Sequence, residues 1–159
     1  MAQHAVTLRL ARRSDAAAMA ELSRRHIEEG LTPRYTPGRI ARLIADPETI
    51  ALVADDAAGV QGFAVMAFGD ERAHLLLLCV QPRQRRQGVA RRLVDWLMAS
   101  AQVAGMASVH LELRADNEGA RAFYRSLGFA DTLRVPGYYE GRVDAQRMVR
   151  LLRLARQEE

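Results

Sequence analysis

The hydrophobic pattern divides the first third of the chain into one strand and two helices. Val6–Leu10 alternates weakly between apolar and polar residues, as a short strand does. Ser14 is a favourable helix cap, and the helix it opens is expected to end near Gly30. Thr36 followed by Pro37 is a favourable cap and first position for a second helix. The pattern therefore predicts a β-α-α start.

Three apolar runs of strand length follow, at Ile50–Ala54, Val60–Phe68 and Ala73–Val80. The first two are joined by Asp55–Gly59, a short segment rich in turn-forming residues. Short connections join antiparallel strands. We therefore expect an antiparallel meander over these three runs.

The second half of the chain alternates helices and strands. Apolar residues repeat with helical spacing from Gly88 until Gly105. Ser108–Arg114 then alternates strictly between apolar and polar residues, so its polar side chains share one face of a strand. A capped helix should end at Gly128, followed by two closing strands at Phe129–Val135 and Asp144–Leu152. The loop between these strands is expected at residues 136–139.

This element order predicts an α/β fold in which a mixed sheet carries helices on both faces. The chain has 159 residues, the size of one ordinary domain, so residues 1–159 are expected to form a single domain. No apolar run approaches the roughly 18 residues that a membrane span needs. The N-terminus lacks the pattern of a signal peptide.

Composition narrows the function further. The single cysteine, Cys79, lies in an apolar run, which indicates a small core residue and fits a reducing cytoplasm. All 23 basic residues are arginine and the net charge is +4. Most arginines are spread along the chain, which argues against a nucleic-acid-binding surface. The few histidines lack metal-ligand spacing, so no metal is expected.

The segment from Val80 to Ala90 reads as a strand end, a basic turn and a helix start. Unpaired N–H groups in a first helical turn, together with the helix dipole, attract anions. Gly88 and Ala90 would let a diphosphate approach the backbone, and Arg85 adds charge. The sequence has no lysine, which excludes a P-loop, and the Rossmann glycine pattern is missing here.

These residues resemble the acyl-CoA pyrophosphate motif of the GNAT acetyltransferase superfamily. The resemblance rests on Val80-x-Pro82, Arg85-x-x-Gly88-x-Ala90, Leu111-Glu112-Leu113-Arg114-Ala115-x-Asn117 and Ala122-Phe123-Tyr124-x-x-Leu127-Gly128-Phe129. Within the superfamily the chain is most similar to RimI-type protein N-terminal acetyltransferases, although Val143 stands where a glutamate usually precedes Asp144. The resemblance implies a mostly antiparallel sheet of six to seven strands and acetyl-CoA as co-substrate.

The resemblance also implies catalytic roles. Tyr124 would protonate or hydrogen-bond the departing CoA sulfur, for which a phenol is a plausible acid. Glu112 would act as the base, since partial burial of a carboxyl raises its pKa. His74 and His110 are alternative bases, and His74 is the better placed because its strand leads into the anion-binding turn. The sequence leaves open whether Glu112, His74 or water alone takes the proton.

The remaining site residues are also implied by the resemblance. The acceptor would contact Glu28, Tyr138 and Tyr139, and Asn117 would hydrogen-bond pantetheine. The full set expected to bind the cofactor is Leu78, Cys79, Val80, Arg85, Arg86, Gln87, Gly88, Val89, Ala90, Asn117, Ala120 and Tyr124.

The acceptor and the assembly stay open at this point. The acceptor could be a protein or peptide N-terminus, or a small amine such as a polyamine, amino acid or aminoglycoside. A non-catalytic acyl-CoA-binding module is the rival from another class. The protein could be a monomer or a homodimer.

Overall fold

The structure is a computed structural model that describes residues 5–85 and 87–153. The chain divides into two compact units, and three elements contribute residues to both. The first unit comprises residues 1–67 and 75–97, and the second comprises residues 68–74 and 98–159.

Strands β1 (Thr7–Leu10), β2 (Thr49–Asp56), β3 (Gly59–Phe68) and the later part of β4 (Arg72–Val80) build the sheet of the first unit. β1 pairs antiparallel with β2, and β2 pairs antiparallel with β3. A two-residue turn joins β2 to β3. The structure therefore confirms the expected hairpin.

Two helices of the first unit show how local sequence sets helix ends. α2 (Pro37–Ala45) begins as expected, because the Thr36 side chain accepts a hydrogen bond from the Arg39 N–H. The expectation for Ser14 is wrong. A short 3-10 turn (Arg13–Asp15) precedes α1 (Ala16–His26), and the Asp15 carboxylate accepts from the Arg12 N–H at 2.7 Å.

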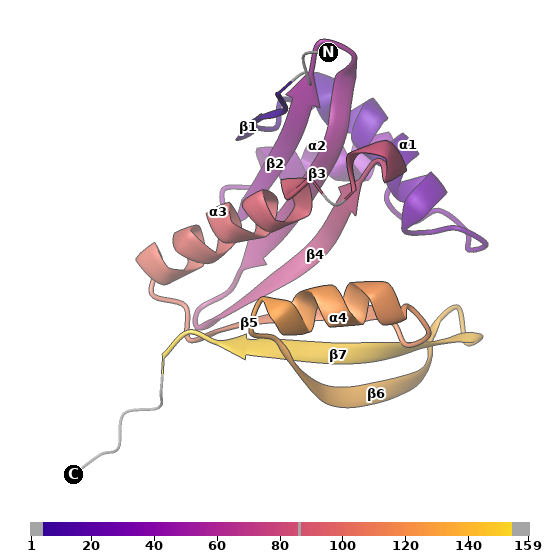
Figure 1. Ribbon diagram of the computed structural model, residues 1–159, viewed down its shortest axis with the longest axis vertical. Helices are drawn as coiled ribbons and strands as arrows, with labels where there is room; N and C mark the ends of the chain where they lie inside the picture. The colour runs from indigo at the N-terminus through magenta and orange to yellow at the C-terminus, as the bar shows by residue number, and fades with distance from the viewer. Residues whose placement is uncertain (1–4, 86, 154–159) are drawn as a thin grey trace. The chain divides into compact units, whose positions relative to one another are not determined.

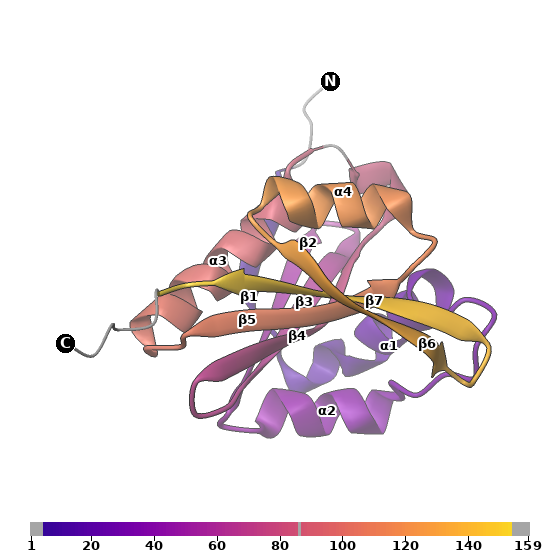
Figure 2. The same cartoon turned by 90° about the horizontal axis from the view of Figure 1, so that it is seen from below.

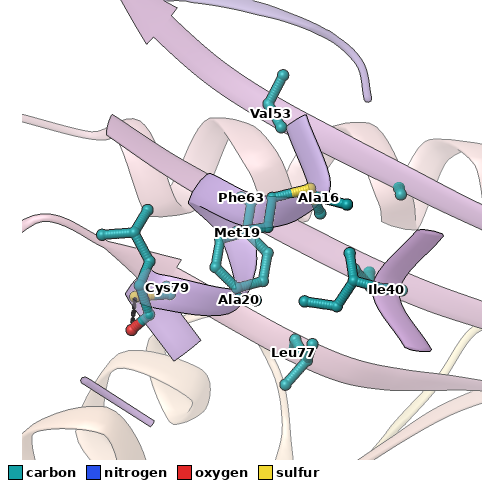
Figure 3. Packing of buried hydrophobic residues seen from close by; sticks show 11 residues of the cluster. Ala16, Met19, Ala20, Ile40, Val53, Phe63, Leu77 and Cys79 are labelled. Atoms are coloured by element: carbon teal, nitrogen blue, oxygen red, sulfur yellow. Dashed lines mark hydrogen bonds between the residues drawn. The ribbon is translucent and has the colours of Figure 1, made fainter. Parts of the chain in front are cut away.

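The core of the first unit lies between these helices and one face of the sheet (Figure 3). Phe63 and Ile40 are completely buried there, and Met19 of α1 packs beside them. The other face of β2 and β3 is buried too, and α3 (Val89–Val103) runs over that side (Figures 1 and 2). Burial of apolar surface on both faces is the main term that stabilises such a layered unit.

β4 alternates regularly along most of its length. Successive side chains of a regular strand point to opposite faces. Ala73, Leu75, Leu77 and Cys79 are buried, and the residues between them are partly exposed. Leu77 and Cys79 belong to the core cluster of the first unit. The alternation ends at Val80, which is buried directly after Cys79.

The second unit contains strands β5 (Ser108–Arg114), β6 (Ala130–Tyr139) and β7 (Val143–Leu151). β7 pairs antiparallel with both β5 and β6, and the first residues of β4 pair in parallel with β5. Helix α4 (Glu118–Ser126) lies along one face of these strands (Figures 1 and 2).

The hydrogen-bonded order of the strands is β1-β2-β3-β4-β5-β7-β6. Seven strands in the described part of the chain thus form the mixed, mostly antiparallel sheet that was expected. One boundary differs from the expectation. β6 continues through residues 136–139, which were predicted as a loop, and its register shifts between Val135 and Tyr139. The Asp144 carboxylate accepts from the Gly137 N–H at 2.9 Å and supports this irregular stretch.

Candidate active site

The turn that was predicted to bind an anion lies between β4 and α3, as expected. After β4, a 3-10 turn (Pro82–Gln84) leads to Gly88, whose φ of 76° is a conformation that favours glycine. The Gly88 carbonyl accepts from the Arg92 N–H at 3.0 Å, so the helix is initiated at this glycine. The N–H groups of the first turn of α3, from Val89 and Ala90 onward, have no acceptor within the helix.

The arginines around this turn fall into two groups. Arg83 donates to the Gln61 side chain at 2.9 and 3.1 Å, and Arg92 donates to the Val6 carbonyl at 3.1 Å. Both side chains are thus engaged in hydrogen bonds within the first unit. Arg85, by contrast, makes no hydrogen bond or ion pair with any residue that the structure describes. Arg86 lies outside the described residues.

The end of β4 is tightly packed. Cys79 is buried, its thiol lies 3.7 Å from the Leu22 carbonyl, and burial raises its pKa to about 12. The thiol is therefore a core group, as the sequence indicated, and is not reactive. A Cβ on Gly62 would lie 2.9 Å from the Cys79 carbonyl. Val80 is buried and Leu78 is half-buried.

Three strands of the second unit bring together His74, Glu112 and Arg147. The register pairs Glu112 of β5 with Arg147 of β7, and His74 of β4 with His110 of β5. The Glu112 carboxylate contacts His74 Nε2 at 2.5 Å and accepts from Arg147 Nε at 3.0 Å. The Glu112 side chain is only 10% exposed, whereas that of His74 is 41% exposed.

These contacts overturn the expected protonation of Glu112. Burial alone would raise the pKa of its carboxyl, but the hydrogen bonds and charges of His74 and Arg147 outweigh burial and hold the pKa below its usual value. The expected raised pKa is wrong. The arginine opposite Glu112 is Arg147 of β7, which the strand register places there.

A hollow of about 250 Å³ opens beside these residues. His110 contributes to it, and the hydroxyl of Ser108 lies 2.8 Å from His110 Nε2. Burial, followed by the positive charges of Arg72 and His74, lowers the pKa of His110. The lining residues are Arg72, Ala73, His74, His110, Glu112 and Arg147.

Tyr124 lies on α4, where its ring packs edge-on against Phe123 and Phe129. It is 9% exposed, and burial, helped by the neighbouring Tyr139, raises the pKa of its phenol. No hydrogen bond joins its hydroxyl to any other described residue. The phenol is thus kept protonated and has an unused donor.

The remaining predicted residues have structural partners of their own. The Asn117 side chain caps α4 by accepting from the Ala120 N–H at 3.1 Å, and Ala120 is half-buried. Gln87 donates to the Arg83 carbonyl at 3.4 Å. Tyr138 and Tyr139 are in edge-to-face contact at 4.9 Å, and Tyr138 is exposed.

Glu28 has a structural role that the sequence did not suggest. Its carboxylate accepts from the Ser23 hydroxyl at 2.8 Å, from the Arg34 N–H, and from the Tyr35 N–H at 3.4 Å. The residue is buried. The carboxylate therefore fixes the segment between α1 and α2, and an acceptor contact by Glu28 stays a prediction.

In residues 5–85 and 87–153, no group of three or more histidine, cysteine, aspartate or glutamate side chains could hold a metal ion. The helices within these ranges are too short or too polar to cross a bilayer.

Comparison with known proteins decides the family. The sequence model of the acetyltransferase (GNAT) family matches residues 16–129, more than half of the chain. The chain belongs to the GNAT family. The resemblance to this family, which the sequence indicated from residues 80–90 and from the strand and helix that follow, is therefore confirmed.

Among relatives of this GNAT protein, the ribosomal protein bS18-alanine N-acetyltransferase of Escherichia coli (strain K12) is 37% identical over 86 residues. The matched stretch covers 52% of this chain and 58% of that one. The chain thus spans a little over half the length of this curated relative.

Two crystal structures match more of the chain. Ard1 from Thermoplasma volcanium is 31% identical with a TM-score of 0.82, covering 94% of this chain and 99% of that one. The ribosomal-protein-S18-alanine N-acetyltransferase from Escherichia coli is 25% identical with a TM-score of 0.81, covering 97% and 98%.

Sequence reasoning missed three residues that line the hollow, Arg72, Ala73 and Arg147. Nothing in the local sequence distinguishes the two arginines from the others of the chain. The alternation of β7 could have placed Arg147 on a polar face, but only the β5–β7 register brings it to Glu112.

Proposed function

We propose that this GNAT protein transfers the acetyl group of acetyl-CoA directly to a primary amine, with both substrates bound together. The observation that carries the proposal is a half-exposed histidine, His74, held by the buried carboxylate of Glu112 beside an open hollow. A binding module would need no such pair.

His74 is the base in this proposal, and Glu112 positions it. The lowered pKa of Glu112 keeps its carboxylate ionised, so it accepts the Nε2–H of His74. The other ring nitrogen, Nδ1, then carries the lone pair that takes the proton from the attacking amine. Arg147 holds the second carboxylate oxygen and fixes the orientation of the pair.

The family co-substrate, acetyl-CoA, supplies a thioester that an amine can attack. The residues proposed to hold it are the open N–H groups of Val89 and Ala90, the side chain of Arg85, and the β4 backbone at Leu78–Val80. Tyr124 is proposed to donate its hydroxyl hydrogen to the departing sulfur, which its protonated phenol and unused donor support.

A protein or peptide N-terminus is the proposed acceptor. An N-terminal amine has a reference pKa near 7.7–8.0, against about 10.4 for a lysine amine, so one histidine suffices to deprotonate it. The names of the E. coli relative and of its crystal structure describe alanine N-acetyltransferases. The arginines of the hollow argue against polycationic acceptors such as polyamines and aminoglycosides.

Release of free thiol from acetyl-CoA in the presence of N-terminal peptides tests the proposal. Glu112→Gln should lower kcat about 100-fold, the order that general base catalysis contributes. Glu71→Gln, a change at an exposed residue of the same unit, is the matched control and should keep full activity. Thermal unfolding with and without acetyl-CoA checks that the Glu112 variant still binds the cofactor.

Two outcomes would contradict the proposal. One is no thiol release with any peptide or small amine although acetyl-CoA raises the Tm, which would indicate a binding module. The other is a Glu112→Gln variant as active as Glu71→Gln.

A further inference from the structure

The hollow beside His74 has an unbalanced set of charges. Arg72, Arg147, His74 and His110 line it, and Glu112 is the sole carboxylate among its six lining residues. That carboxylate is already engaged, because one oxygen contacts His74 and the other accepts from Arg147. The hollow therefore keeps an excess of positive charge after its internal pairs are formed.

Arg72 is the charged residue of the hollow whose side chain is not engaged by Glu112. It makes no side-chain hydrogen bond or ion pair with any residue in the described part of the second unit, and it makes none with the described residues of the first. Arg147 differs from Arg72 in this respect, because its Nε lies 3.0 Å from a carboxylate oxygen of Glu112. The positive charge of Arg72 acts on the hollow, because it adds to the effect of burial in lowering the pKa of His110.

We propose that Arg72, with His110 and Arg147 beside it, binds a carboxylate of the acceptor, so that the preferred acceptors are peptides with an acidic side chain next to the N-terminal amine. This inference rests on the proposed function, because it assumes that the amine is delivered to His74. It adds the chemistry by which one peptide is chosen over another.

The spacing of Arg72 and His74 along β4 matches the spacing of residues in an extended acceptor peptide. Arg72 and His74 are two residues apart on one strand, so they share a face and are separated by about 6.6 Å. An extended peptide advances about 3.3–3.6 Å per residue. An amine at His74 therefore leaves the side chain of the second peptide residue within reach of Arg72.

The size of the hollow also fits. Its volume of about 250 Å³ is large enough to admit a short acidic side chain. A guanidinium can bind a carboxylate through two parallel hydrogen bonds.

The test compares three peptides that begin Ala-Asp, Ala-Asn and Ala-Lys and are otherwise identical. The wild-type protein should acetylate the Asp peptide with a kcat/KM about five- to tenfold above the Asn peptide, with the Lys peptide lowest. Arg72→Gln should abolish the preference for Asp over Asn, and Arg72→Glu should invert the order of Asp and Lys.

The control is Arg150→Gln. It removes the same charge from β7, but the Arg150 side chain lies beside Gly128 and does not line the hollow. The preference for Asp should survive in this variant. Thermal unfolding of all three variants checks that each is folded.

The results separate this inference from the proposed function. Acetylation of all three peptides at equal rates, or a preference for Asp that survives Arg72→Gln, would overturn the acidic site while leaving the enzyme intact. Faster acetylation of free aspartate than of the Asp peptide would also overturn it, since the carboxylate would then belong to an amino acid. Absence of acetylation with every acceptor would instead contradict the proposed function.

Discussion

Two glutamates, one in each unit, are largely shielded from solvent but have different surroundings: Glu28 is buried, and the side chain of Glu112 is 10% exposed. Glu28 of the first unit accepts hydrogen bonds from a serine hydroxyl and from two backbone N–H groups of its own connecting segment. Glu112 of the second unit is held by His74 and Arg147, which come from two other strands and border an open hollow.

The contrast shows that burial of a carboxylate does not by itself mark a catalytic group. The hydrogen-bond partners of the carboxylate indicate whether its role is structural or catalytic. Donors that cannot change charge, as around Glu28, hold the backbone in place. A half-exposed imidazole beside an open hollow, as His74 is, gives the carboxylate a partner that a substrate can reach. The predictions below separate these two roles.

The largest expected effect on stability comes from Glu28→Ala. The change leaves the Ser23 hydroxyl and two N–H groups without their acceptor, which should lower the free energy of unfolding by about 1–3 kcal/mol. Urea unfolding followed by circular dichroism measures it. Loss of kcat with unchanged stability would contradict the structural role of Glu28.

A smaller effect is expected for the acid stability of Glu112. Its pKa is lower in the folded protein than in the unfolded chain, so its contribution to stability is complete above pH 4.5, the ordinary value, and is lost as pH falls through the folded pKa. Glu112→Gln should therefore lose less stability than the wild type on acidification.

The expected difference between the two proteins is about 0.5–1 kcal/mol, the scale of a partly exposed ion pair. Unfolding midpoints measured from pH 6 to pH 3 check it. Parallel acid curves for the two proteins would show that the ionised carboxylate is not stabilised by His74 and Arg147.

How much the sequence could predict depended on whether a feature was local. The strand Ser108–Arg114, the Thr36 cap and the turn at Gly88 were predictable because each depends on neighbouring residues. The Ser14 cap failed because the first turn begins one residue earlier: Arg12 occupies the cap position of a 3-10 turn, and the Asp15 carboxylate accepts from the Arg12 N–H.

The candidate site was predictable only in part, for the same reason. The family motif pointed to Glu112 and Tyr124, and His74 was an open alternative. His74 lies beside Glu112 and Arg147 only because three strands pair in a particular register. This pairing cannot be predicted from a local sequence pattern. The protonation of Glu112 was misjudged because its partners were unknown.

The most direct test of the central claim is the single-turnover rate of acetyl transfer in His74→Gln, Glu112→Gln and the double variant, at saturating acetyl-CoA. If His74 takes the proton and Glu112 only positions it, each single change should slow transfer about 100-fold and the double variant should be no slower than either, since residues that act as one unit are not additive. Losses that multiply to about 10⁴-fold in the double variant would contradict the account, because the two residues would then act independently.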